Sequence, residues 1–140
     1  MKRLLILALA AVALPVLSSC KAKTDPAVEE AWRAYEKFGE ALFKKQFAET
    51  RAMTAGSTSW GWAPKAEKEA SEERGTFGTI TFDRIRETLS GTSVMFRVNV
   101  TVNYSGGPSG PVKKRYKHEV TVTKISGDWK VTHLEVTILE

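Results

Sequence analysis

The chain has 140 residues, of which 42% are hydrophobic, and a formal net charge of +5. A chain of this length builds one hydrophobic core, which excludes two independent domains. Its single cysteine excludes an internal disulfide and any zinc site made of several thiolates. The excess of positive charge is too small to indicate nucleic acid as a partner.

The first nineteen residues have the pattern of a bacterial signal peptide. A basic start, Met1-Lys2-Arg3, precedes an apolar run from Leu4 to Leu17. This run of about 14 residues is shorter than the roughly 20 that a membrane-spanning helix needs, and polar residues follow it directly. We therefore expect residues 1–19 to be removed, which leaves 19 Lys and Arg against 16 Asp and Glu, a net charge of +3.

The signal segment ends in Leu17-Ser18-Ser19-Cys20, which resembles the lipobox of bacterial lipoproteins. The resemblance implies cleavage before Cys20 and acylation at its thiol and new amino terminus, with palmitate among the acyl groups. One acyl chain gives only marginal membrane binding, whereas two or three hold a protein in place. The alternative is an ordinary secretory signal with a chance cysteine near its cleavage site.

A lipid anchor predicts a place in the cell envelope. Residues 20–25 would form a short lipidated tether, which keeps residues 26–140 close to the membrane. By resemblance to the sorting rule of enteric bacteria, Lys21 favours the periplasmic face of the outer membrane if the host has two membranes. The domain itself is expected to be a monomer or a homodimer.

Residues 26–140 begin with the signature of an amphipathic helix. Asp25-Pro26 is typical of a helix start, with Asp as the N-cap and Pro at the first position. A stripe at alternating spacings of four and three then predicts a helix of roughly 25 residues, ending near 53–56, with a break near 45–48 as the alternative. Gly39 on the buried side predicts close approach of another backbone. The stripe consists of Val28, Trp32, Tyr35, Gly39, Leu42 and Gln46.

A short, highly charged helix is expected at residues 65–74, after Pro64. Its alanines leave little to bury, so we expect it on the surface. The segment before it carries Trp60 and Trp62 among Gly, Ser and Thr. These two indoles either stack a flat ligand at the mouth of the domain or plug its open end as core residues.

After Gly75 the hydrophobic pattern changes to the period of two that is typical of strands. Strands are predicted at 79–89, 94–104, 112–125 and 129–138, joined by short turns. Changes of parity indicate one bulge near Asp83-Arg84 and another in the last strand. Such strands form an antiparallel meander, whose apolar face needs the helix as a cover. The predicted fold is therefore α+β, with the long N-terminal helix packed on a curved four-stranded antiparallel sheet.

This combination of lipobox, aromatic-rich helix and curved sheet resembles small bacterial lipoproteins of the NTF2-like, cystatin-like superfamily, particularly the DUF4878 group. The resemblance spans residues 26–140, and its best local match is the turn Lys124-Ile-Ser-Gly-Asp-Trp-Lys-Val131. It implies a cone whose interior can hold a small molecule. The superfamily includes isomerases, dehydratases, transport factors and binding proteins, so the fold does not choose a function.

An enzyme of this superfamily would be expected to place a carboxylate or an acid–base pair inside the cone. Asp83 and His133 lie near the two expected bulges, which would allow either to turn inward. Because polar residues alternate routinely on half-exposed strands, we expect both to be solvated strand residues, and an inward placement is the alternative. Neither has a motif partner, and His118 and His133 have no ligand spacing with nearby acids, so we expect neither a metal nor another cofactor.

A basic cluster opens the third predicted strand, formed by Lys113, Lys114, Arg115 and Lys117. Near a membrane it would contact anionic head groups, lipopolysaccharide or cell-wall polymer. The alternative is protection of a strand edge against unwanted pairing. Taken together, the sequence predicts a lipid-anchored, non-enzymatic binding or interaction module, and the alternative is a small-molecule enzyme or carrier that uses the cone interior.

Overall fold

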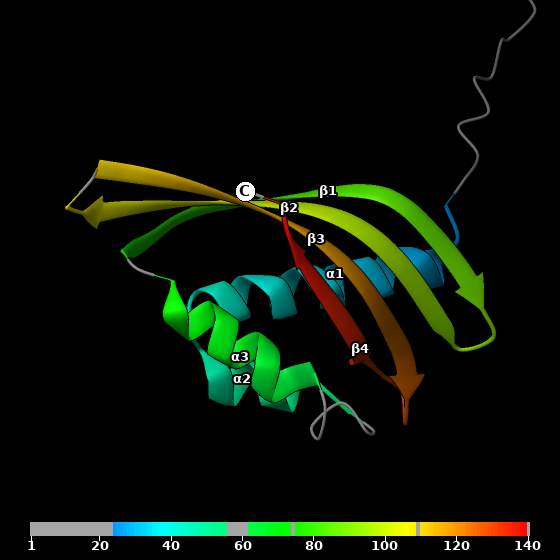
Figure 1. Ribbon diagram of the computed structural model, residues 1–140. Helices are drawn as coiled ribbons and strands as arrows, with labels where there is room; N and C mark the ends of the chain where they lie inside the picture. Colours follow the sequence, from blue (N-terminus) through cyan, green and yellow to red (C-terminus); the bar gives the residue numbers. More distant parts are fainter. Residues whose placement is uncertain (1–23, 56–61, 74, 109, 140) are drawn as a thin grey trace, which may run out of the picture.

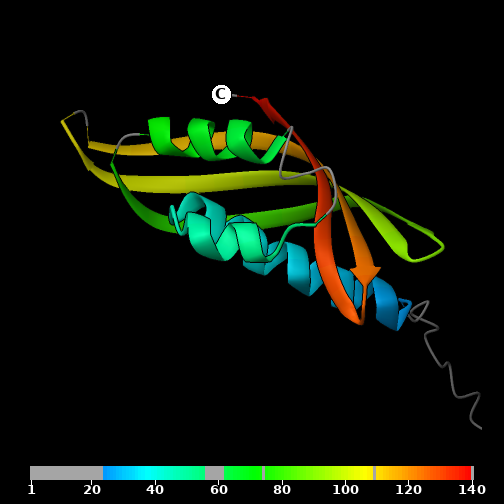
Figure 2. The same ribbon diagram turned by 90° about the horizontal axis from the view of Figure 1, so that it is seen from below.

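The computed structural model describes residues 24–55, 62–73, 75–108 and 110–139. It confirms the predicted α+β fold, in which helices cover one face of a four-stranded antiparallel sheet with the order β1-β2-β3-β4 (Figure 1). All three helices lie on the same face of the sheet (Figure 2). The elements are α1 (Pro26–Phe43), α2 (Phe47–Ala52), α3 (Trp62–Glu72), β1 (Thr76–Ser90), β2 (Ser93–Gly107), β3 (Gly110–Ile125) and β4 (Asp128–Ile138).

Helix α1 begins where the sequence predicts. The Asp25 carboxylate accepts a hydrogen bond from the Ala27 amide at 2.9 Å, and Pro26 occupies the first turn. The helix stops at Phe43, and Lys45 adopts a positive φ of 61° before α2 starts at Phe47. The left-handed residue ends the helix, so the expected single helix of roughly 25 residues is wrong and the break near 45–48 is confirmed.

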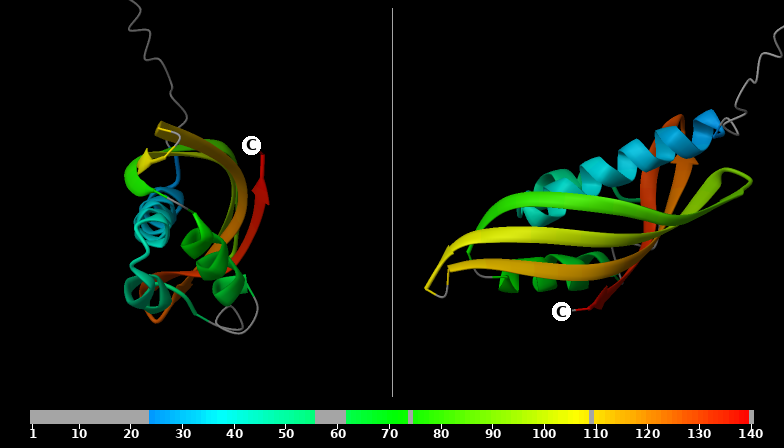
Figure 3. Two further views of the ribbon diagram at one scale, coloured as in Figure 1. Left: turned by 60° about the vertical axis from the view of Figure 1, so that its left-hand side comes forward. Right: turned by 90° about the horizontal axis from the view of Figure 1, so that it is seen from above.

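The sheet curls around α1, as the left panel of Figure 3 shows. Both predicted bulges contribute to this curvature. In β1 the register shifts between Arg84 and Arg86, slightly later than expected. In β4, Val131 faces Val122 and His133 faces Thr121, so one extra residue lies between them.

The core lies between α1 and the inner face of the sheet. The predicted alternation of β2 is confirmed, because each inward side chain of that strand is 0–3% exposed. Full burial of one such aliphatic side chain contributes about 1.5–3 kcal/mol. The inward residues of β2 are Val94, Phe96, Val98, Val100, Val102 and Tyr104, and α1 meets them with Val28, Ala31, Trp32, Tyr35, Phe38, Leu42 and Phe43.

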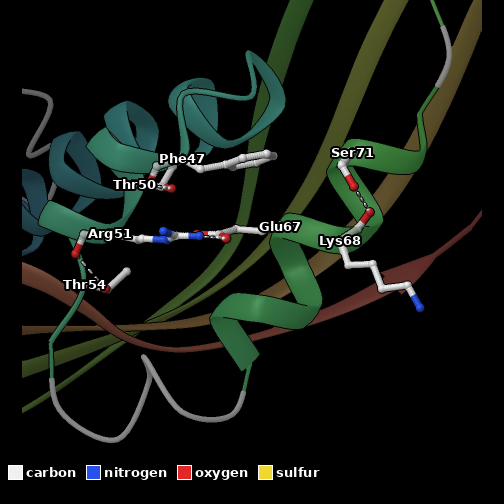
Figure 4. A network of polar contacts seen from close by, with 7 residues as sticks. All are labelled: Phe47, Thr50, Arg51, Thr54, Glu67, Lys68 and Ser71. Carbon is white, nitrogen blue, oxygen red and sulfur yellow. Dashed lines mark hydrogen bonds and ion pairs between the residues drawn. The ribbon is translucent and has the colours of Figure 1, made fainter.

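Helix α3 packs more closely than its sequence suggested. Ala63, Ala66 and Ala70 are buried, and their small side chains let the helix backbone approach the rest of the core. Arg51 of α2 holds Glu67 of α3 through two hydrogen bonds of 2.9 and 2.7 Å, which Figure 4 shows. The expectation that these alanines leave little to bury is therefore corrected, although Lys65, Lys68 and Glu72 of α3 are exposed as expected.

Gly39 marks a close approach, but the group that approaches is a ring and not a backbone. A Cβ atom at this position would lie 2.7 Å from Cε1 of Phe82, well inside van der Waals contact. The absence of a side chain lets α1 sit against the ring on β1. The prediction of a nearby backbone is thus wrong, while the need for glycine on the buried side of the helix stands.

Replacing Gly39 by Ala should lower the free energy of unfolding by about 1 kcal/mol. Alanine favours a helix by about 1 kcal/mol over glycine, but overpacking of a core costs about 1–3 kcal/mol. Urea denaturation measures the difference. In a Phe82→Leu background, which replaces the flat ring by a smaller flexible side chain, the same substitution should cost less. An equal loss in both backgrounds would contradict the proposed clash.

Candidate functional site

The interior of the cone is filled by aromatic side chains. Ring centroids lie 5.3 Å apart for Trp32 and Phe96, 5.4 Å for Tyr35 and Phe82, and 5.2 Å for Phe43 and Tyr116. Two hollows beneath α3 each have a volume of only about 10 Å³. A space of this size holds about one water molecule. Neither hollow has room for a small organic ligand.

His118 is a core residue that the sequence analysis missed. Its side chain is fully buried, and Nδ1 lies 2.8 Å from the hydroxyl of Tyr35. Burial lowers its pKa to about 3, so the ring is neutral. The sequence did contain a sign of this burial, because His118 has the same parity on β3 as the inward residues Tyr116 and Val120.

The other nitrogen of His118, Nε2, has no hydrogen-bond partner among the described residues. The ring also borders one of the two small hollows, next to Glu69 and Tyr116. An unpaired buried donor or acceptor costs free energy, and one ordered water is the usual remedy.

Two tyrosines near the end of the cone remain protonated. The Tyr116 hydroxyl donates a hydrogen bond to Glu73 at 2.8 Å, and burial together with this contact raises its pKa well above the usual range. Burial, with the nearby Glu73 carboxylate, raises the pKa of Tyr104 to about 12. At neutral pH both are hydrogen-bonding groups and not bases.

Asp83 and His133 lie on the outer face of the sheet. Asp83 faces Asn99 across β1 and β2, and His133 faces Thr121 across β3 and β4; both side chains are exposed. The β1 bulge falls after Arg84, so it does not re-aim Asp83. The β4 bulge inserts Thr132 instead and leaves His133 on the outer face. The two residues belong to opposite edge strands and do not form a pair.

Three residues that the sequence singles out are not fully described in the structure. Cys20 and Trp60 lie outside the described residues, and so does the side chain of Trp62, although its backbone starts α3.

The basic cluster Lys113, Lys114, Arg115 and Lys117 lies on β3, near the β2–β3 turn. Figure 1 places this turn at the end of the sheet opposite to the start of α1.

A groove of about 400 Å³ crosses the outer face of all four strands, and we call it the outer groove. Its charged residues form one row in register, in which Arg86 faces Arg97, Arg97 faces Glu119 and Glu119 faces Glu135. Arg97 and Glu119 form an ion pair at 2.9 Å. The lining residues are Arg86, Thr88, Met95, Phe96, Arg97, Glu119, Val120, Thr121, His133 and Glu135.

A more open hollow of about 500 Å³ lies between α1 and the β3–β4 turn, beside Trp129. Its groups already engage one another. The indole N–H donates to Glu30 at 2.9 Å, and Lys124 lies 3.6 Å from the same carboxylate. The indole hydrogen bond and then the Lys124 charge lower the pKa of Glu30. The outer groove differs from this hollow because its charges form one row in register across the four strands.

The described residues contain no cluster of three or more His, Cys, Asp or Glu side chains that would hold a metal ion. No helix in the described ranges is long and apolar enough to cross a membrane.

The arrangement of elements matches solved structures of the NTF2-like class. A protein from Streptomyces avermitilis, assigned as a dehydratase of the NTF2-like family, has a TM-score of 0.60 and 12% identity, with 81% of this chain and 96% of that one covered. The CaMKII hub of S. rosetta has a TM-score of 0.60 and 14% identity, with 82% and 98% covered.

The fold is NTF2-like. The hub homology domain of the Chlamydomonas reinhardtii CaMKII agrees, with a TM-score of 0.60, 8% identity and 81% and 99% coverage. At such low identity the likeness concerns the fold alone. No protein-family profile and no curated protein matches the sequence.

The pH dependence of stability should report the buried His118 of this NTF2-like domain. Its pKa is about 3 in the folded chain and near 6.5 in the unfolded chain, so the unfolded chain takes up the proton first as the pH falls. The contribution is complete above pH 6.5 and is lost progressively toward pH 3, by on the order of 1 kcal/mol per pH unit. Urea denaturation from pH 4 to 7 measures this slope.

Substitution of His118 by Leu should remove that part of the slope, whereas His133→Gln on the exposed face should retain it. A wild-type slope in the His118 variant would show that the ring is not held neutral in the fold.

Proposed function

We propose that the chain is a lipid-anchored cell-envelope protein, of the kind found in the DUF4878 group, whose NTF2-like domain is a non-enzymatic binding module. Its binding surface is the outer face of the sheet. The observation that carries the proposal is the contrast between an interior packed with aromatic rings and an outer groove of about 400 Å³ lined by unlike charges.

The protonation states of the interior support a non-enzymatic role. A general acid or base works best when its pKa lies near the operating pH. The buried groups are far from that condition, since the pKa of His118 is about 3 and that of Tyr104 about 12. Among the described residues, Asp83 and His133 face outward and lie on opposite edges of the sheet. The interior therefore offers hydrogen bonds but no poised proton donor or acceptor.

The similar structures point in two directions. One is named a dehydratase, and two others are named a hub and an association domain. A hub or association domain is an interaction module, and for this chain that role agrees with a filled interior and an open outer face. We therefore propose an interaction role for this chain, as in the hub and association domains, and not the activity of a dehydratase.

The lipobox and the short tether support attachment to a membrane. Helix α1 has 18 residues and is therefore about 27 Å long. The basic cluster lies near the β2–β3 turn, which is at the far end of α1 and away from its start (Figure 3, right). In an upright domain, Lys113 and its neighbours face away from the anchoring bilayer and toward an anionic component of the envelope.

A carrier role remains the second candidate, because the unpaired Nε2 of His118 borders a hollow beneath α3. The described hydrophobic residues that α3 buries are alanines, so moving it outward loses little buried area per residue. A ligand in this position would need α3 to shift.

Replacing Cys20 by Ser should abolish lipid attachment, because the thiol is the atom that would carry the diacylglycerol. Metabolic labelling with radioactive palmitate, followed by membrane fractionation, should show label on the wild type and an unlabelled precursor for the variant. Ser19→Ala, which keeps a small residue beside the cysteine, is the matched control and should stay labelled. Labelled Cys20→Ser protein would end the lipoprotein assignment.

Native mass spectrometry separates the surface role from the carrier role. The full chain, purified from its own host and released from detergent micelles in the spectrometer, should carry no ligand inside the cone. Any retained adduct should be lost in Arg86→Gln and kept in Ala70→Leu, which fills the hollow beneath α3. The reverse pattern, with the adduct lost only in Ala70→Leu, would support the carrier and contradict the outer face as the binding surface.

A further inference from the structure

The outer groove contains an arrangement of charges that a sheet does not need for its own stability. Across β1, β2, β3 and β4 the row reads Arg86, Arg97, Glu119, Glu135, two cations followed by two anions in direct register. Like charges directly opposite one another on neighbouring strands are destabilising. The row contains two such pairs, one at each end.

The four charges of the row do not all pair with one another. Arg97 binds Glu119 at 2.9 Å in the middle of the row. Among the described residues, neither Arg86 nor Glu135 forms an ion pair, and both are exposed. The two ends of the row therefore remain as a cationic pole on β1 and an anionic pole on β4, each beside a like charge.

The spacing of the two poles follows from sheet geometry. Neighbouring strands lie about 4.8 Å apart, so the centre of the arginine pair and the centre of the glutamate pair are about 10 Å apart. An extended peptide rises about 3.3 Å per residue, so a tripeptide has its terminal ammonium and carboxylate groups about 10 Å apart.

We infer that the outer groove binds an extended zwitterionic ligand of tripeptide length, with its carboxylate between Arg86 and Arg97 and its ammonium group between Glu119 and Glu135. The inference rests on the proposed function, since it names the ligand class of the same surface. Each charge of the ligand then separates two like charges of the protein. A ligand with only one charge would relieve only one end of the row.

The rest of the groove suits such a ligand. Thr88, Met95 and Thr121 line it beside the charged row, and Met95 is 56% exposed. Hydroxyl groups and an adaptable thioether suit the peptide groups and small side chains of an extended ligand. A volume of about 400 Å³ falls within the range of small-molecule sites, roughly 300–1,000 Å³.

A second copy of the chain is the competing occupant. A twofold axis parallel to the strands, between β2 and β3, would place cations of one copy over anions of the other. Two such faces would bring two grooves together and leave a large enclosed volume, whereas a short ligand fills one groove. The ligand is therefore the better occupant, and self-association is an outcome that the experiment detects.

The test uses the full chain in detergent micelles and the peptide Ala-Ala-Ala as the probe. Backbone amide resonances of the charged row should shift in a saturable way during an NMR titration. N-acetylated and C-amidated tri-alanine should each bind about fivefold more weakly, which corresponds to about 1 kcal/mol for one lost exposed charge contact. Free alanine, which is too short to reach both poles, should give no saturable shift in this row.

The variants identify which pole holds which charge. Arg86→Gln and Glu135→Gln should each weaken tri-alanine by about fivefold, whereas Arg86→Lys should keep most of the affinity. N-acetylated tri-alanine should be insensitive to Glu135→Gln but remain sensitive to Arg86→Gln, and the C-amidated peptide should show the reverse. Lys113→Gln, outside the groove on the same sheet, is the matched control and should change nothing.

Three results would overturn the inference. One is the absence of a saturable shift, and another is binding of the capped peptides that is as tight as the binding of uncapped tri-alanine. The third is a dimer in sedimentation velocity that Arg86→Glu dissociates, because the row would then be an interface between copies. A different result would contradict the proposed function itself. This result is an adduct in native mass spectrometry that Ala70→Leu removes and Arg86→Gln does not.

Discussion

The structure depends on one constraint, that an antiparallel sheet with a single apolar face must be covered along its length. The valines of β2 turn inward at every second position and are buried against α1, whose aromatic stripe supplies the cover. Gly39 lets that helix sit directly on the ring of Phe82. The sheet then curls around the helix with bulges after Arg84 and Val131, and Arg84 turns toward α1, where its guanidinium lies over the ring of Trp32 and binds Glu29. Close packing of α1 on the curved sheet is therefore what closes the interior.

Because the interior is packed with aromatic side chains, most polar side chains of the sheet lie on its outer face. Tyr35 and His118 share a hydrogen bond at 2.8 Å, and burial keeps the imidazole neutral, so the pair stabilises the core and does not transfer protons at neutral pH. Polar groups that the core excludes must lie on the other face of the same strands. The outer groove is thus the complement of the core, since every inward valine of β2 fixes an outward neighbour such as Met95 or Arg97. The proposed binding surface on the outer face is made by the same alternation that builds the interior.

Local patterns in the sequence predicted the elements well, because caps, turns and side-chain periods depend on neighbouring residues. Asp25-Pro26, the strand alternation and the two bulges are of this kind. The register row of Arg86, Arg97, Glu119 and Glu135 was not predictable in the same way, because it depends on pairing between residues 11 to 22 positions apart along the chain. A shift of one residue in any pairing would have separated these charges. His118 was missed for a different reason: its inward parity was visible, but a histidine on an apolar face was assessed as a ligand and not as a core residue.

The position of the groove relative to the proposed anchor adds a constraint on any ligand. Arg84, two residues before Arg86, binds Glu29 in the first turn of α1 at 2.9 Å, so the charged row lies at the end of the sheet where α1 begins. The tether from Cys20 to Asp25 spans at most about 17 Å. With Cys20 lipidated, the groove stays near the membrane, and the basic cluster on β3 lies about one helix length farther out. A short zwitterion can enter such a membrane-proximal groove without displacing the domain, whereas a large folded partner would compete with the bilayer for the same space.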